Sequence, residues 1–188
     1  IGPAADLEML PQIRAMQVRG LGDEVFYLTM FKVDIPEFDL PDAHAPVDRM
    51  FIAVLATNGP EKVQGWFDKH WGIAPGEIAD TKLAIIDDAF GVPQRTLDLR
   101  LTVTTMRSRS LVEIDGYPPQ ATERPRHAGH LPPGNAMMSV LVDTLDGLAL
   151  STITPPIRRP EAPYFGRRAA TTLGAMGELI ELVERDPS

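Results

Sequence analysis

Apolar and polar positions alternate in several short stretches of the chain, and glycine-containing turns separate these stretches in pairs. Residues 167–184 show the pattern most clearly, because two β-prone runs flank a turn at Gly174 and the second run is apolar except for Glu181. Such alternation predicts paired strands. Comparable pairs occupy residues 13–18 with 22–29 and residues 97–105 with 110–115, and a strand pair that recurs three times indicates a modular sheet protein.

A complete unit lies in the middle of the chain. Residues 50–56 form a short apolar run that suits a buried strand. Asn58 then caps a helix that has Pro60 in its first turn and ends at Gly72. The apolar stripe of this helix consists of Val63, Trp66, Phe67, His70 and Trp71. Three further strands are expected at residues 83–86, 97–105 and 110–115, so the unit is β-α-β-β-β.

A second unit opens with an apolar strand over residues 136–142. A short helix is expected near residues 145–153, and the strand pair within residues 167–184 closes the unit. Prolines interrupt regular structure before that pair, and they also make residues 34–47 a linker and residues 116–134 a long loop.

The composition is that of a globular protein of 188 residues, with 44% hydrophobic and 23% charged residues. A net charge of −8 argues against nucleic-acid binding, because phosphate contacts need clustered Lys and Arg. The chain has no cysteine, which excludes thiolate catalysis and Cys-ligated metals and fits a cytoplasmic location. No apolar run approaches the roughly 18 residues that span a membrane. The sequence also contains no Gly-rich phosphate loop and no Gly-x-Ser-x-Gly elbow.

The repeated β-α-β-β-β unit, which ends in Gly-Glu-Leu-Ile-Glu-Leu, resembles the vicinal oxygen chelate superfamily of glyoxalases, bleomycin-resistance proteins and extradiol dioxygenases. The resemblance covers residues 48–118 and 135–184, and residues 13–33 resemble the tail of an earlier module. It implies that two modules pair into one curved sheet around a cleft. It also implies a divalent metal ion, which is held by the start of each first strand and the middle of each last strand.

The last-strand positions of this metal site fall on Glu113 and Glu181, and the corresponding residue of the leading fragment is Tyr27. The resemblance therefore implies that the two glutamates are metal ligands, for an ion such as Zn, Ni, Mn or Fe. The first-strand positions fall near Arg49 or Met50 and near Met137 or Met138, none of which is a usual ligand for a divalent ion.

The expected fold is α+β, with paired β-α-β-β-β modules that form a curved mixed β-sheet and helices outside. Modules 48–118 and 135–184 are expected to make one domain over residues 48–186. Residues 1–47 would be the tail of a preceding module followed by a proline-rich linker. Because that tail lacks its opening half, we expect further sequence before Ile1, and the open sheet edge makes a homodimer possible.

Glu113 and Glu181 are the main candidates for chemistry. A carboxylate in an apolar strand must face solvent, pair with a cation or line a cleft. As catalytic residues, the two glutamates would face one cleft and act as metal ligands or as a general base. The alternative is that each faces solvent or pairs with Arg167 or Arg168.

The loop that contains His127 and His130 is the densest polar cluster of the chain. Its arginines, Arg124 and Arg126, would hold a carboxylate or phosphate of a substrate, and Arg49 is a further candidate for substrate binding. Two histidines three residues apart also suit a metal on a helix, but the flanking prolines favour a loop. The alternative is a solvated connection without a functional role.

Other polar or sulfur-containing residues have structural explanations. His70 lies on the apolar stripe of the helix, so we expect it to be packed and hydrogen-bonded. Met137 and Met138 suit core packing. Asp87 and Asp88, like Glu77 and Asp80, are expected on solvated faces, and His44 on the surface of the linker.

Two functions follow from these observations. The first is a metal-dependent lyase, isomerase or oxygenase of the glyoxalase-like class that acts on a small organic acid or aromatic compound. The second is a metal-free protein that binds or sequesters a small molecule, in the manner of bleomycin-resistance proteins. A third possibility is that the chain is a structural part of a larger protein whose site lies elsewhere.

Overall fold

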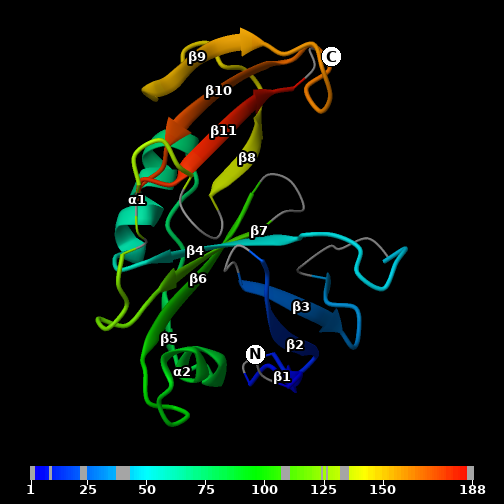
Figure 1. Cartoon of the computed structure of the whole chain (residues 1–188), viewed down its shortest axis with the longest axis vertical. Helices are drawn as coiled ribbons and strands as arrows, with labels where there is room; N and C mark the ends of the chain where they lie inside the picture. Colours follow the sequence, from blue (N-terminus) through cyan, green and yellow to red (C-terminus); the bar gives the residue numbers. More distant parts are fainter. Residues whose placement is uncertain are drawn as a thin grey trace. The chain divides into compact units, whose positions relative to one another are not determined.

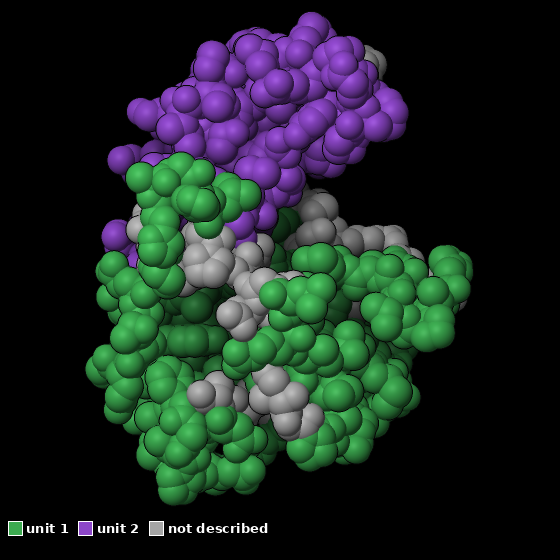
Figure 2. Space-filling model, in the orientation of Figure 1, with its two compact units in different colours: residues 1–60, 77–134 green, residues 61–76, 135–188 purple. Residues whose placement is uncertain are grey.

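The computed structural model of the chain describes residues 3–8, 10–21, 25–36, 43–106, 111–123, 125, 127–131 and 136–185. The chain divides into two compact units (Figure 2). Unit 1 comprises residues 1–60 and 77–134, and unit 2 comprises residues 61–76 and 135–188. The leading strands of the chain thus share a unit with the strands of the middle module. The expected two-module domain over residues 48–186 stays a prediction.

The larger sheet of unit 1 contains β4 (Ile52–Thr57), β5 (Ala79–Thr81), β6 (Leu99–Thr105) and β7 (Leu111–Gly116). Its strand order is β4-β7-β6-β5 (Figure 1). β4 and β7 run parallel, whereas β6 is antiparallel to both of its neighbours. The parallel pair joins strands that are distant in sequence, and it places Val54 directly beside Glu113.

The smaller sheet of unit 1 contains β1 (Ala5–Asp6), β2 (Ile13–Arg19) and β3 (Val25–Phe31) in that order. The predicted strand pair is confirmed, and its antiparallel register places Gln17 opposite Tyr27. β3 also contacts the segment that leads into β4, because the ring of Phe31 lies 5.5 Å from that of Phe51 in an edge-on arrangement. This ring pair therefore joins β3 to the start of the larger sheet.

The strand expected at residues 83–86 is wrong, because these residues lead into helix α2 (Ala84–Phe90). Ile86 and Phe90 face the same side of this helix, since they are four residues apart. Ile86 is buried with Leu97 and Leu99, and Phe90 packs against the same cluster. Helical spacing thus buries the apolar residues that alternation assigned to a strand.

Asp87 is a second correction, because its side chain is fully buried rather than solvated. Its Oδ2 accepts a hydrogen bond from the backbone N–H of Arg95 at 2.7 Å, and its Oδ1 accepts one from that of Leu97 at 2.8 Å. Two charge-assisted hydrogen bonds compensate for the loss of hydration of the carboxylate. Asp87 therefore fixes the loop between α2 and β6.

We predict that Asp87→Asn lowers the free energy of unfolding by about 2 kcal/mol, because the amide accepts at only one atom and leaves one buried N–H without a partner. Equilibrium unfolding in urea measures the change. Asp88→Asn is the matched control, since Asp88 is the exposed neighbour on the same helix. Equal effects of the two substitutions would contradict the structural role of Asp87.

The sheet of unit 2 contains β8 (Met137–Val142), β9 (Thr152–Arg158), β10 (Arg168–Leu173) and β11 (Leu179–Glu184). Its order is β8-β11-β10-β9, and β8 runs parallel to β11 (Figure 1). This arrangement repeats that of the larger sheet of unit 1: the first strand pairs in parallel with the last strand, beside two antiparallel neighbours. Here Ser139 lies directly beside Glu181.

Helix α1 (Pro60–Trp71) follows β4 and confirms the predicted helix. Trp66 and Trp71 of α1 pack on the buried cluster of unit 2, which consists of Leu145, Ala170, Ile180 and Leu182. His70 is packed and hydrogen-bonded as expected, because its ring lies 4.8 Å from that of Trp66 and its Nδ1 is 3.1 Å from the carbonyl oxygen of Ala149. A helix of the middle module therefore covers the sheet of the second module.

The helix expected near residues 145–153 is wrong. Residues 143–151 form turns and bends, in which Gly147 has a φ of 74°. The leucines of this segment are nevertheless internal, because Leu145 is buried and Leu148 and Leu150 pack against the same cluster as α1. The segment therefore contributes apolar side chains to the core without being helical, and α1 packs on the same cluster.

β9 was not predicted because Pro155 and Pro156 lie within it. The structure explains why these prolines are tolerated: among the described strands β9 pairs only with β10, and it is exposed along its whole length. An edge strand does not need every backbone N–H for pairing. The register of this pair also shifts near Thr171, which marks an irregular ladder.

The predicted α+β class is confirmed by these mixed and antiparallel sheets with a small number of helices outside them. None of the described helices combines the length and apolar character that crossing a lipid bilayer requires.

Candidate functional site

One strand position carries a polar residue in each of the three strand pairs. Tyr27, Glu113 and Glu181 are each the third residue of β3, β7 and β11, respectively. Their antiparallel neighbours differ, since Gln17 faces Tyr27, Val103 faces Glu113 and Thr171 faces Glu181. The repeat seen in the sequence is therefore also a repeat of position within the sheet.

In unit 1, Glu113 and Asp115 lie on the same face of β7, because residues two apart in a strand point the same way. The side chains of the two residues are hydrogen-bonded to each other. Apolar residues flank the pair on both neighbouring strands: Val54 and Val103 beside Glu113, and Ala56 and Leu101 beside Asp115. Two carboxyl groups thus lie in the middle of an otherwise apolar sheet face.

Tyr27 and Gln17 bring the smaller sheet to this pair. The Nε2 of Gln17, a residue that is 3% exposed, donates a hydrogen bond to the hydroxyl of Tyr27 at 2.8 Å. The negative charges of Glu113 and Asp115 act on the hydroxyl of Tyr27, and also on that of Tyr117 directly after β7. Two phenols are therefore close enough to the carboxyl pair to be influenced by its charge, and Gln17 is bonded to one of them.

Burial governs the ionisation of this cluster. It raises the pKa of Glu113, and it raises that of Asp115 to about 8 together with the charge and hydrogen bond of Glu113. Burial and the two acids also raise the pKa of Tyr27 to about 12, although the hydrogen bond from Gln17 opposes the shift. At neutral pH the acids thus hold a shared proton, and the phenol of Tyr27 stays neutral.

Asp115 has one further property. It is 2% exposed, and its Oδ1 has no hydrogen-bond partner in the part of the chain that the structure describes. A buried acceptor without a donor is costly, so this atom is a natural contact point for a ligand or for water. The cluster can therefore accept a hydrogen bond and exchange a proton.

The sequence identified Glu113 but missed Gln17, Asp115 and Tyr117. Asp115 carried a usable signal, because it follows Glu113 at the spacing that shares a strand face. Gln17 and Tyr117 carried none, since their proximity to the acids depends on the packing of β3 against β7 and on the turn after β7.

In unit 2, both oxygens of Glu181 accept hydrogen bonds. The hydroxyl of Ser139 donates to Oε2 at 2.7 Å, and that of Tyr164 donates to Oε1 at 2.6 Å. The bond to Glu181 raises the pKa of Tyr164. These three residues border a cavity of about 180 Å³ that is also lined by Val140, Leu141, Pro163, Arg167 and Val183.

Arg168 pairs with Glu184 rather than with Glu181. Its Nε donates to Glu184 at 2.8 Å, and its Nη1 donates to Asp146 at 2.9 Å. Glu184 also accepts from the backbone N–H of Leu145 at 3.1 Å, and these donors, Arg168 first, hold its pKa at about 2. This network attaches the loop after β8 to the end of β11, so its role is structural.

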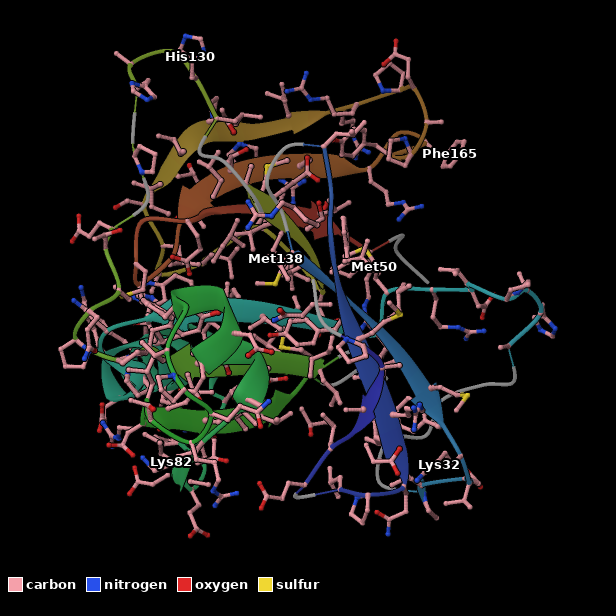
Figure 3. All side chains as sticks on the ribbon, turned by 60° about the horizontal axis from the view of Figure 1, so that its bottom comes forward. Lys32, Met50, Lys82, His130, Met138 and Phe165 are labelled. Atoms are coloured by element: carbon pink, nitrogen blue, oxygen red, sulfur yellow. The ribbon has the colours of Figure 1, made fainter. Side chains whose placement is uncertain are left out.

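The remaining predicted site residues lie elsewhere. His130 is on an exposed loop (Figure 3), and the loop also carries His127. The ring centroids of the two histidines are 6.5 Å apart, beside a cavity of about 340 Å³ that Pro125 and Leu131 also line. Arg49 is exposed and forms an ion pair with Asp48. Arg124 and Arg126 lie outside the described residues. A role of these residues in substrate binding stays a prediction.

The side chains near Glu113 and Glu181 fit a metal site of the expected kind poorly. Among the described residues, no three His, Cys, Asp or Glu side chains are grouped so that they could hold an ion. The first-strand neighbours of the two glutamates are Val54, which has no donor atom, and Ser139, which already bonds Glu181. Met50 is 77% exposed and Met137 is 44% exposed. A Zn, Ni, Mn or Fe site would need imidazole or further carboxylate ligands.

Comparison with solved structures identifies the architecture. A glyoxalase family protein from Bacillus cereus matches 77% of the chain with a TM-score of 0.56 and 15% identity, and 98% of that protein is covered. The chain has the vicinal oxygen chelate fold. Glyoxalase I from Zea mays matches 96% of it with a TM-score of 0.55 and 10% identity. The expected resemblance is thus confirmed at the level of the fold.

The similarity to these structures extends to the fold and not to the activity, because sequence identities of 15% and 10% indicate a common architecture alone. The chain spans 57% of the length of the maize glyoxalase I. No protein-family model matches the chain, and no curated protein matches it in sequence.

We predict that the stability of the protein falls as pH rises from about 5 to 8, and that Asp115→Asn removes most of this slope. The folded-state pKa of Asp115 is raised to about 8, so the folded protein binds a proton more tightly than the unfolded chain throughout this window. The stability that proton binding contributes is complete below the unfolded pKa and is lost as pH approaches 8. Urea unfolding should show that, between pH 5 and pH 8, the wild type loses about 3 kcal/mol more of its free energy of unfolding than Asp115→Asn does.

Asp98→Asn is the control for this pH dependence. Asp98 has an 81% exposed side chain that pairs with Lys82, so its replacement removes one acidic charge without touching the buried pair. Asp98→Asn should keep the slope of the wild type. Parallel curves for the wild type and Asp115→Asn would show that Asp115 has an ordinary pKa.

Proposed function

We propose that the protein binds a small, planar organic molecule without a metal ion, on the face of the β4-β7-β6-β5 sheet that carries Glu113 and Asp115. The observation that carries this proposal is the buried carboxyl pair next to Tyr27, in which the Oδ1 of Asp115 has no partner among the described residues. A hydrogen-bond donor on a ligand would satisfy that oxygen. This hydrogen bond would contribute more to the binding free energy than one to a solvated acceptor, because the buried oxygen has no competing bond to water.

The surroundings of the pair support a ligand with an aromatic or otherwise flat body. Val103 is 42% exposed and Ala56 is exposed, so apolar surface beside the acids is accessible. The rings of Tyr27 and Tyr117 add aromatic surface, and flat molecules stack on such rings. Small-molecule sites typically combine these features, with apolar walls and a few polar groups that orient the ligand.

The fold supports the same class of function. The matched structures include a glyoxalase I, whose fold the chain shares, and small-molecule chemistry is a common use of this architecture. The metal ion expected from the resemblance stays a prediction. The proposal does not include it, because the described donor side chains around Glu113 and Glu181 are too few to hold an ion.

A second candidate function is acid–base catalysis on the bound molecule, in an isomerase or lyase reaction. The pKa of about 8 for Asp115 favours it, because a carboxyl group that titrates near neutral pH can both take and return a proton. The pair would remove a proton from carbon next to a carbonyl group and deliver it to a neighbouring atom. Tyr27, kept neutral by its raised pKa, would donate a hydrogen bond to the developing oxyanion.

Other expectations accompany the proposal without a test so far. Glu181 and the loop around His130 stay candidate ligand-binding groups of their own units. A cytoplasmic location and a homodimer stay predictions from the sequence.

The test of the binding function is a screen of small aromatic compounds by ligand-observed NMR, with protein that has been treated with EDTA. We expect hits whose affinity, measured by calorimetry, falls at least about tenfold in Tyr27→Ala, a loss of about 1.4 kcal/mol. Tyr27→Phe keeps the ring and should retain most of the affinity. Glu181→Gln is the matched control, because it changes the equivalent position of the other unit and should leave the affinity unchanged.

Two results would overturn the proposal. One is a set of hits that lose affinity in Glu181→Gln but not in Tyr27→Ala. The other is binding that EDTA abolishes and Zn, Ni, Mn or Fe(II) restores, which would revive the metal-dependent reading. Exchange of a carbon-bound hydrogen of a hit in D2O, lost in Asp115→Asn, would establish the catalytic candidate.

A further inference from the structure

The carboxyl pair of unit 1 differs from several exposed carboxylates of the chain, because it has no cationic partner in the part of the chain that the structure describes. Burial and the mutual interaction of Glu113 and Asp115 account for their ionisation, and no Lys or Arg among the described residues contributes. Several exposed acids are instead paired with cations: Asp6 with Arg14 and Lys32, Glu8 with Arg95, Asp48 with Arg49, Asp98 with Lys82 and Asp146 with Arg168.

This distribution is the reverse of what stability alone favours. A buried charge is expensive without a partner, whereas an exposed ion pair contributes little. The pair nevertheless keeps its acids in an apolar setting, beside Val103 and Leu101 of β6 and beside two neutral phenols. A site that holds uncompensated negative charge and an unpartnered Oδ1 is prepared for a positive group from outside.

We propose that this face selects a flat organic cation, such as an amidinium or a protonated aromatic amine, and not an organic acid. The inference rests on the proposed binding function and names its ligand class. The N–H groups of the cation would donate to Asp115 and Glu113 in a charge-assisted contact, and its flat body would lie against the rings of Tyr27 and Tyr117.

The same geometry opposes an anion. A carboxylate ligand would place a third acidic group beside Glu113 and Asp115 in a weakly hydrated setting, where like charges repel strongly. The net charge of −8 adds to this discrimination, because it raises the local concentration of cations and lowers that of anions. The proposal therefore favours a cation over the small organic acid that the sequence suggested.

Three isosteric probes test the inference: benzamidinium, benzamide and benzoate have nearly the same shape and carry one positive, no and one negative charge. With the full chain in about 150 mM salt, benzamidinium should bind at least tenfold more tightly than benzamide, and benzoate most weakly. Asp115→Asn and Glu113→Gln should each bring the affinity for benzamidinium close to that for benzamide. Asp98→Asn, which removes an exposed acid of the same unit, should leave the order unchanged.

The outcomes separate this inference from the proposed function. Benzoate or benzamide binding as tightly as benzamidinium, with the sensitivity to Tyr27→Ala retained, would overturn the cation selectivity and leave the binding site in place. An equal loss in Asp98→Asn and Asp115→Asn would reduce the preference to the net charge and also overturn it. If Tyr27→Ala changes the affinity of no compound, whatever its charge, both proposals fail.

Discussion

The parallel pairing between the first and last strand of each module is the constraint on which this structure depends. β4 and β7 are separated by more than fifty residues in sequence, yet their ladder joins the edge strand β4 to the central strand β7, and β8 and β11 repeat this pairing in unit 2. Because a central strand has neighbours on both edges, its polar residues are surrounded by the side chains of two other strands. This is why Glu113 lies among valines, and why a glutamate at that position has a consequence that the same residue on an edge strand would not have.

The sequence predicted those features that depend on local spacing. The strand pair of β2 and β3, helix α1 and the position of Glu113 and Glu181 in the last strands follow from alternation, capping residues and periodicity. What it could not predict depends on contacts distant in sequence. Residues 83–86 have strand-like composition but become helical against Leu97 and Leu99, and residues 145–153 lack a helix because Trp66 and Trp71 already cover that sheet. The sequence identified Glu113 but not Gln17 for the same reason, since Gln17 and Tyr27 belong to another sheet.

Two glutamates at one repeated position have diverged in their surroundings. Glu181 receives a hydroxyl donor on each oxygen, so its hydrogen-bonding capacity is largely filled by Ser139 and Tyr164. Glu113 is instead hydrogen-bonded to a second acid, Asp115, whose Oδ1 has no hydrogen-bond partner among the described residues. Equivalent places in a repeated architecture thus differ in what they leave unsatisfied, and unsatisfied capacity is what an incoming molecule can use.

Helix α1 has a consequence for how the protein can be divided. Its sequence lies between two strands of unit 1, but its tryptophans belong to the interior of unit 2. The repeated module and the compact unit therefore differ in their bounds, because a cut between modules 48–118 and 135–184 separates α1 from the leucines that it covers. A shortened chain that ends before residue 135 would retain every strand of unit 1 but would expose the apolar side of α1 to water. Protein fragments designed around the repeat would for this reason aggregate, whereas fragments that keep both units intact would not.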